Sequence, residues 1–312
     1  MHNAKLLKSI LIPTLGISAI GSIAAVSTSC ESDKLDKPYV VITANADSTL
    51  TLNNYGGNSP NLQYSTDGTS WNTYSEEISI NQGQKIYLRG NNPNGWSHSY
   101  ALYSTLLIEG DVSISGNVMA LLDNGAKTGE EGDITDIPCD YCFFKLFYQS
   151  DGITSVSENF LPATTLANEC YQCMFYQCTS LTTAPDLPAI NLADSCYINM
   201  FSNCSSLTAA PELPAMTLAG SCYQGMFIGC TSLTTAPELP ATTLANGCYQ
   251  YMFSNCSSLN SVKIAYEGNY NASYFAGWVD GVANSGTFYY NGTTQNAQDF
   301  EFPSGWETEH FN

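Results

Sequence analysis

The sequence predicts a mainly β protein with short helices, and three observations lead to that prediction. A block of 26 residues recurs without insertion in the middle of the chain. Short runs of β-forming residues, separated by turn signals, precede this block. Only 12% of the 312 residues are charged and 44% are hydrophobic, which is enough for a sizeable core. We therefore expect a small N-terminal β-sandwich, then a solenoid of stacked repeats, and then a β-rich C-terminal cap.

Residues 1–29 have the composition of a targeting segment. Two lysines precede an uncharged, mostly apolar run of 17 residues at positions 10–26, and small residues at 27–29 precede Cys30. This arrangement resembles a bacterial lipobox and the signal segments of mollicute lipoproteins, which implies that Cys30 is diacylated and becomes the new N-terminus. Simple secretion and an uncleaved anchor stay open as alternatives, although a membrane span needs about 20 residues.

The next part of the chain is expected to form the sandwich. Residues 30–38 are polar and charged, so we expect a tether between membrane and fold. Residues 39–115 hold several short β-type runs, and Asp67-Gly68 between two of them predicts a hairpin because both residues tolerate positive φ. Residues 116–138 are rich in Gly and acidic residues and predict a linker or an entry cap.

The repeats occupy residues 139–264. Twelve of 26 positions are identical in the four regular units, which begin at Leu161, Leu187, Leu213 and Leu239, and a degenerate unit precedes them. A fixed period of 20–29 residues with Leu and Cys at set offsets is typical of a leucine-rich repeat solenoid. The period fails after residue 264, so we expect residues 265–312 to form the cap that closes the open core.

One unit shows how the stack would bury its apolar side chains. The stretch 180–184 predicts a short strand with Leu181 pointing inward and its neighbours outward, ended by Pro185. Residues 191–194 lead into a predicted short helix, in which Cys196 and Met200 share one side. Stacking such units would align the Leu, Met, Phe and Cys positions into continuous internal ladders.

The repeated blocks also resemble a known family. The pattern Met-Phe-x-x-Cys-x-Ser-Leu stands at 174–181, 200–207, 226–233 and 252–259, and it resembles the BspA-type leucine-rich repeat surface proteins of bacteria. The resemblance implies surface display and, in some members, attachment to host or neighbouring cells, and it implies no catalytic residues. We therefore expect a lipoprotein anchored on the extracellular face of the cell membrane, whose partner is a host or community surface protein or a glycan.

The predicted binding surface is the concave strand face of the solenoid. Its outward positions carry short hydrogen-bonding side chains, namely Ser180, Thr182, Ser206, Thr208, Ser232, Thr234, Ser258 and Asn260. No aromatic anchor stands among them, so the affinity there would be modest or would depend on avidity.

Two other functions stay open. Aromatic residues of the sandwich could form a sugar-stacking platform, which would make the protein a carbohydrate-binding module on a repeat spacer. These residues are Trp71, Tyr74, Tyr87 and Trp96. A purely structural surface-coat protein is the remaining alternative.

Charge and histidine content argue against several other functions. Asp and Glu outnumber Lys and Arg by 28 to 9, and the formal net charge of −19 disfavours binding to nucleic acid. The only histidines are His2, His98 and His310. The chain therefore has very few residues from which a nucleophile–histidine pair or a histidine-ligated metal site could be built. No pair of carboxylates stands out for glycoside hydrolysis. We expect no enzyme activity, no metal site and no cofactor.

Most of the twelve cysteines follow the repeat. One set is Cys178, Cys204, Cys230 and Cys256, and a second set is Cys170, Cys196, Cys222 and Cys248. Such periodic sets predict buried, small apolar side chains, although export also permits disulfides. Cys139-x-x-Cys142 and Cys170-x-x-Cys173 have a spacing seen in zinc sites, but Cys142 and Cys170 already hold repeat positions.

A set of acidic residues follows the same period. Asp186 and Glu212 each follow a proline, and Glu238 does so in the next unit. Stacking would align them along one edge, where we expect them to be solvated. Because carboxylates suit Ca²⁺, a weak cation site stays open as an alternative.

Overall fold

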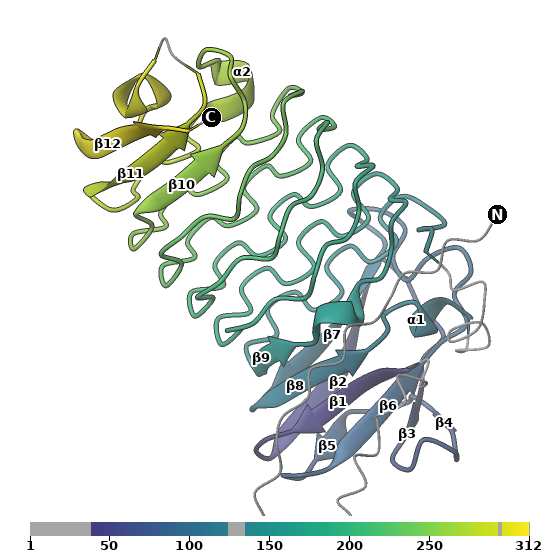
Figure 1. Ribbon diagram of the computed structural model, residues 1–312. Coiled ribbons are helices and arrows are strands. Elements are labelled where there is room, and N and C mark those ends of the chain that lie inside the picture. Colours follow the sequence, from purple (N-terminus) through teal and green to yellow (C-terminus); the bar gives the residue numbers. More distant parts are fainter. Residues whose placement is uncertain (1–38, 124–134, 293–294, 312) are drawn as a thin grey trace, which may run out of the picture. The chain divides into compact units, whose positions relative to one another are not determined.

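The computed structural model describes residues 39–123, 135–292 and 295–311 (Figure 1). The proposed lipidation site Cys30 and the tether at 30–38 lie outside these residues. The described chain is mainly β with few, short helices, as predicted from the sequence. None of the helices in this part of the chain reaches the length and hydropathy that a membrane span requires.

Two sheets form the N-terminal region. Across the first sheet lie β4 (Asn72–Thr73), β3 (Gln63–Ser65), β6 (Lys85–Arg89), β1 (Val40–Ala44), β8 (Val112–Gly116) and β9 (Ile153–Val156). Across the second lie β5 (Ile78–Ile80), β2 (Ser48–Tyr55) and β7 (Tyr103–Glu109). All neighbours are antiparallel except β8 and β9, which run parallel with a register shift.

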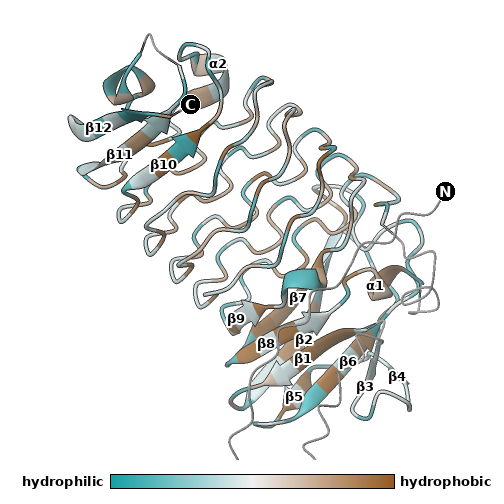
Figure 2. Cartoon of the chain, viewed as in Figure 1, coloured by the Kyte–Doolittle hydropathy of each residue, from teal (hydrophilic) through white to brown (hydrophobic). Residues whose placement is uncertain are grey.

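Alternation along the strands places the apolar side chains in one shared core. Ile42 pairs with Ile86 across β1 and β6, and both are fully buried, whereas Lys85 next to Ile86 is exposed. Leu50 of the second sheet pairs with Ile108 and is also fully buried. Figure 2 shows this mixture of apolar and polar residues along the strands. Burial of these apolar side chains is the main stabilising contribution here.

The predicted hairpin at Asp67-Gly68 forms between β3 and β4. Gly68 has a φ of 73°, and the Asp67 carboxylate accepts the N–H groups of Thr69 and Ser70, each at 2.7 Å. These hydrogen bonds favour the ionised carboxylate and lower the pKa of Asp67. The connection spans residues 66–71, so it is a longer loop than a two-residue turn.

The predicted linker at 116–138 is partly structured. It contains α1 (Ala120–Asp123), in which Leu121 and Leu122 are buried. The strand β9 lies inside the predicted repeat region, yet it extends the first sheet by pairing with β8. The sandwich sheet and the first repeat unit therefore share main-chain hydrogen bonds.

The described chain from residue 161 to residue 260 contains turns and isolated bridges in place of regular strands. A 3₁₀ turn, η1 (Glu158–Phe160), precedes this stretch. Parallel bridges join equivalent positions of successive units, for example Thr183 to Ala209 and Thr217 to Thr243. Each pair is 26 residues apart, so adjacent units lie side by side in register. The strand predicted at 180–184 is thus reduced to single bridged residues.

The helix predicted after residues 191–194 is wrong. Residues 195–203 form overlapping turns, and the φ angles of Ser195, Asn199 and Asn203 are positive, at 60°, 52° and 61°. The Phe201 N–H donates to Met226 of the next unit at 2.9 Å, whereas the Ser202 N–H closes a local turn. An α-helix needs every N–H for bonds within itself. Here alternate N–H groups bond to the neighbouring unit, so a helix cannot form.

Two columns of stacked aromatic rings run through the repeats. The tyrosine ladder, with ring centroids 5.7–6.2 Å apart, consists of Phe143, Tyr171, Tyr197, Tyr223, Tyr249 and Phe275. The phenylalanine ladder, with centroids 5.5–6.4 Å apart, consists of Phe147, Phe175, Phe201, Phe227, Phe253 and Trp278. These spacings lie in the range of favourable aromatic pairs.

The C-terminal region continues the parallel pairing. Its sheet has the order β10 (Ser261–Ile264), β11 (Ser285–Tyr290) and β12 (Gly305–His310). Two short helices accompany it, α2 (Ala272–Phe275) and η2 (Ala297–Phe300), and an asparagine caps each one. Phe275 and Trp278 end the two ring ladders and pack against Phe300, so aromatic side chains cover the last unit.

Candidate recognition site

The structure places the predicted Ser and Thr positions next to one another along the repeats. Thr182, Thr208, Thr234, Ser258 and Asn260 are exposed, while Ser180, Ser206 and Ser232 are half-buried. The leucine inside each trio is fully buried, as Leu207 is between Ser206 and Thr208. The Asn260 N–H donates to the Thr234 carbonyl at 2.9 Å, so these two positions are direct neighbours.

The face that carries these residues differs in one respect from the expectation. The sheets are not curled, so the structure gives this row no concave face. One hydroxyl of the row is also already used, because Thr182 Oγ1 donates to the Thr154 carbonyl at 2.8 Å. The row is therefore an exposed strip of short polar side chains without a concave face, in which the Thr182 hydroxyl already donates within the fold.

The acidic residues of the repeats lie exposed at their predicted edge. Asp186, Glu212 and Glu238 are all exposed, and Glu238 forms an ion pair with Lys263, with Nζ and Oε1 2.7 Å apart. Within the described ranges, no three His, Cys, Asp or Glu side chains gather as ligands of a metal ion. This holds for the two Cys-x-x-Cys motifs as well.

Both periodic cysteine sets are buried in the core. In the set that begins at Cys178, each thiol donates to the carbonyl of a phenylalanine in the preceding unit, at 3.0–3.2 Å. Burial raises the pKa of Cys170 and of Cys256 to about 12, so these thiols stay protonated at neutral pH. Among the described cysteines only Cys139 is partly exposed, and hydrogen bonding with the Cys142 thiol lowers its pKa.

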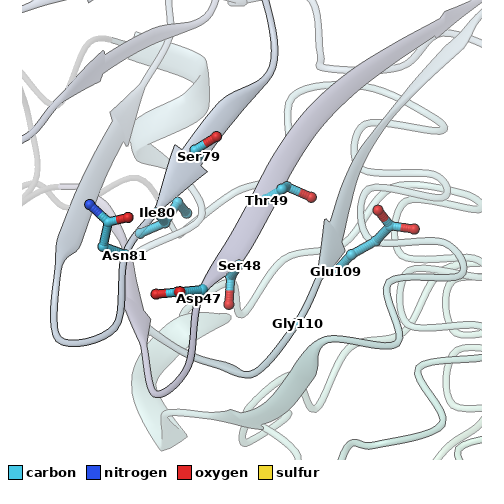
Figure 3. A pocket seen from close by; sticks show the side chains of 8 residues that line it. All are labelled: Asp47, Ser48, Thr49, Ser79, Ile80, Asn81, Glu109 and Gly110. Carbon is cyan, nitrogen blue, oxygen red and sulfur yellow. The ribbon is translucent and has the colours of Figure 1, made fainter.

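A shallow hollow of about 320 Å³ lies where β2, β5 and β7 meet their turns (Figure 3). Figure 3 shows Asp47 and Glu109 on opposite sides of it, with Ser48 and Thr49 between them. The Asp47 carboxylate accepts the Gln82 N–H at 2.8 Å and so has a structural role. The hollow is open and its carboxylates do not converge, so it offers no arrangement for acid–base chemistry.

The aromatic platform considered from the sequence is not formed by its four residues together. Trp96 is fully buried, and its Nε1–H donates to the Ser104 carbonyl at 3.0 Å. Trp71 is partly exposed, with the Arg89 guanidinium 4.0 Å from its ring centroid. Tyr74 is half-buried, and its hydroxyl accepts the N–H of Leu52. Trp96 belongs to the core, which removes it from any platform.

A different aromatic cluster lies where the second sheet meets the first two repeat units. We call it the tyrosine–lysine cluster; it consists of Tyr55, Tyr103, Lys145, Tyr148 and Tyr176. Tyr55 and Tyr103 are paired across β2 and β7, and their rings stack 4.5 Å apart. Tyr148 and Tyr176 stack 5.1 Å apart. Lys145 Nζ lies 4.5 Å from the centroid of Tyr103 and 4.7 Å from that of Tyr148, and so connects the two pairs.

The sequence contained only a partial signal for this cluster. Tyr148 and Tyr176 hold equivalent positions in the first two units, where later units carry Ser202 and Ile228. Nothing in the sequence places Tyr55 and Tyr103 beside them, because their approach depends on how the second sheet meets the repeats.

Comparisons with known proteins do not identify the chain. Comparison with protein-family models finds no match, and comparisons with curated proteins and with solved structures find no significant match. Function is therefore inferred from the residues themselves.

Proposed function

We propose that this chain is a membrane-anchored bacterial surface lipoprotein with leucine-rich repeats that recognises host or neighbouring-cell molecules without catalysis. The 26-residue period supports the repeat assignment, as do the parallel bridges between equivalent positions. The ring ladders support it as well, because a unit of this size cannot bury its apolar side chains alone and must stack. We infer that these units stack as a leucine-rich repeat solenoid, with turns in place of helices.

The exposed threonine row is the observation that carries the recognition proposal. Stacking uses the Leu, Met, Phe and Cys positions for the core, and it presents Thr182, Thr208 and Thr234 to solvent at equivalent positions. Regular, shallow hydroxyl surfaces offer many weak hydrogen bonds, so attachment would draw strength from several copies acting together.

The membrane anchor is proposed at Cys30. Its sequence context is that of a lipobox, and residues 30–38 would join the acylated cysteine to the sandwich. Two acyl chains give stable anchoring, where a single chain gives only marginal binding. This placement would present the repeats outside the cell.

The test replaces the exposed threonines by lysine in the full chain. The triple variant Thr182→Lys, Thr208→Lys, Thr234→Lys should reduce attachment of protein-coated beads to cell layers by at least about tenfold, because several hydrogen bonds are lost together. Solvent-facing changes usually cost under about 0.5 kcal/mol each, so the fold should persist.

A second set of threonines in the repeats, at positions that form bridges between units, provides a matched control. Thr165, Thr217 and Thr243 are also exposed threonines, at bridged positions, and replacing them by lysine adds the same charge. The control variant should attach as the unmodified protein does. Equal loss in both triple variants, or no loss in the first, would show that the threonine row is not the recognition surface.

A further inference from the structure

The tyrosine–lysine cluster contains a positive charge that no carboxylate among the described residues neutralises. In the described part of the chain Lys145 forms no ion pair, and the one ion pair recorded there joins Lys263 to Glu238. Burial raises the pKa of the Tyr148 hydroxyl, and the neighbouring groups that add to this effect are Tyr176, Cys173, Tyr103 and Tyr55. Among the described residues, Lys145 therefore lies next to tyrosines and has no carboxylate partner, in a chain of net charge −19.

The backbone at Lys145 adds to this observation. Its φ is +58°, a left-handed conformation in which the Cβ atom of any residue other than glycine is unfavourably placed. The equivalent positions of the third and fourth units carry Asn199 and Gly225, which tolerate it well. A lysine is therefore not required for the turn itself.

The tyrosines supply both flat apolar faces and polar groups. Tyr55 is 44% exposed, whereas Tyr103, Tyr148 and Tyr176 are half-buried, so the Tyr55 ring is the part of the cluster that is most open to solvent. Burial raises the pKa of Tyr148, which keeps its hydroxyl protonated at neutral pH. Within the described residues, none of the four cluster hydroxyls has a hydrogen-bond partner. Aromatic residues with an apolar body and a polar tip suit ligands that are apolar on one face and polar at the edge.

We propose that the tyrosine–lysine cluster binds an acidic saccharide, with a sugar ring against the exposed Tyr55 ring and the acidic group at Lys145. A pyranose ring presents C–H groups on its face and hydroxyls at its edge, which matches rings edged by free hydroxyls. A carboxylate or sulfate supplies the anion that Lys145 lacks, and hydrogen bonds to a charged group are the stronger ones. Flat rings suit a sugar face better than the side chains of an acidic peptide. This site deepens the recognition function proposed above, but it lies on other residues than the threonine row.

The test compares two probes that differ only in charge. A hyaluronan hexasaccharide carries glucuronate carboxylates, and its carboxyl-reduced form carries glucose in their place. Calorimetric titration of the full chain should show tighter binding of the acidic form, and added salt should narrow the difference. A chondroitin sulfate hexasaccharide shows whether sulfate serves as well, and a polyglutamate peptide tests the competing ligand class.

Substitutions then test whether the hexasaccharide binds at the cluster. Lys145→Asn, which introduces the residue of position 199, should weaken binding of the acidic hexasaccharide by at least about tenfold, the factor expected for one charged hydrogen bond. It should leave the carboxyl-reduced form unaffected. Tyr55→Ala should weaken binding of both forms. Lys85→Asn and Tyr251→Ala remove an exposed lysine and a tyrosine of 45% exposure elsewhere, and should change neither.

Several results would overturn the proposal. Equal binding of the acidic and the reduced forms would do so, as would no binding of either at millimolar concentration. Unchanged acidic binding by Lys145→Asn would also reject it, and equally tight binding of polyglutamate would make the site a peptide site. The bead attachment of the threonine variants is measured separately, so failure of the saccharide site and failure of the repeat surface can be told apart.

Discussion

Two cysteines of one repeat unit should respond in opposite ways to serine. Cys204 and Cys196 are both fully buried. The Cys204 thiol donates to the Phe175 carbonyl at 3.1 Å, whereas the Cys196 sulfur lies beside backbone groups of Ala193 and of its own residue and, among the described residues, forms no such bond to a carbonyl of the preceding unit. A serine at position 204 therefore keeps an acceptor for its hydroxyl, and a serine at position 196 does not.

The expected magnitudes follow from this difference. An unpaired buried hydroxyl costs about 1–3 kcal/mol, whereas a paired one contributes roughly 0.5–1.5 kcal/mol. Alanine at the same position removes the sulfur without adding a polar group, so it corrects for lost packing. Cys196→Ser should be less stable than Cys196→Ala by about 1–3 kcal/mol. Cys204→Ser should be at least as stable as Cys204→Ala, although the shorter C–O bond leaves its hydroxyl slightly farther from the carbonyl.

Urea unfolding of the full chain under reducing conditions measures these differences. The four variants are compared by their midpoints, provided that the dependence on urea concentration is the same in all of them. The sign of the serine–alanine difference should reverse between the two positions. If Cys196→Ser is the more stable variant of its pair, or Cys204→Ser the less stable one of its own, the assigned hydrogen bonding in the ladders is wrong.

Three further predictions concern the anchor, the thiols and the ring ladders. Cys30→Ala should move the protein from the detergent phase to the aqueous phase in phase partitioning, and unchanged partitioning would point to an uncleaved anchor. Iodoacetamide should label Cys139 first in the folded, reduced protein, because among the described cysteines it alone is partly exposed and its lowered pKa increases the thiolate fraction; mass spectrometry showing early labelling of buried thiols would contradict this. Phe201→Ala should lower the free energy of unfolding by about 3–5 kcal/mol, and a loss under about 1 kcal/mol in urea would argue against a stacked ladder.

The ladder positions could be predicted from the sequence, but the backbone conformation that places them could not. Cys196, Met200 and Cys204 recur every four residues, and all three are fully buried. Spacing of four fits one face of a helix, but it fits a run of turns equally well. The distinguishing signal was the Asn, Ser or Gly between them, since positions such as Asn199 and Gly225 have positive φ. Periodicity predicted which side chains are inside, and local residue preference was needed to predict the turns.

The tyrosine–lysine cluster shows a second limit. Its contacts join Tyr55 and Tyr103 to Lys145 and Tyr148, across large separations in sequence. No period or motif links these positions, so only the arrangement of the second sheet against the repeats reveals them. Trp96 illustrates the reverse case, because an aromatic residue proposed for the surface is needed in the core.

The N-terminal sheets act as the first cap of the repeat stack, and this determines how recognition can be tested. In later units a carbonyl such as that of Met226 accepts an N–H from the preceding unit. The first unit has no preceding unit, yet its Cys142 carbonyl accepts the N–H groups of Trp96 and Ser97, and its Leu146 carbonyl accepts that of Leu106. Removing the sandwich would expose these acceptors and one end of the ring ladders, and a stack with an open end loses a neighbour interface. Loss of binding in an isolated repeat fragment would therefore report unfolding, so substitutions in the full chain are the sound way to compare the threonine row with the tyrosine–lysine cluster.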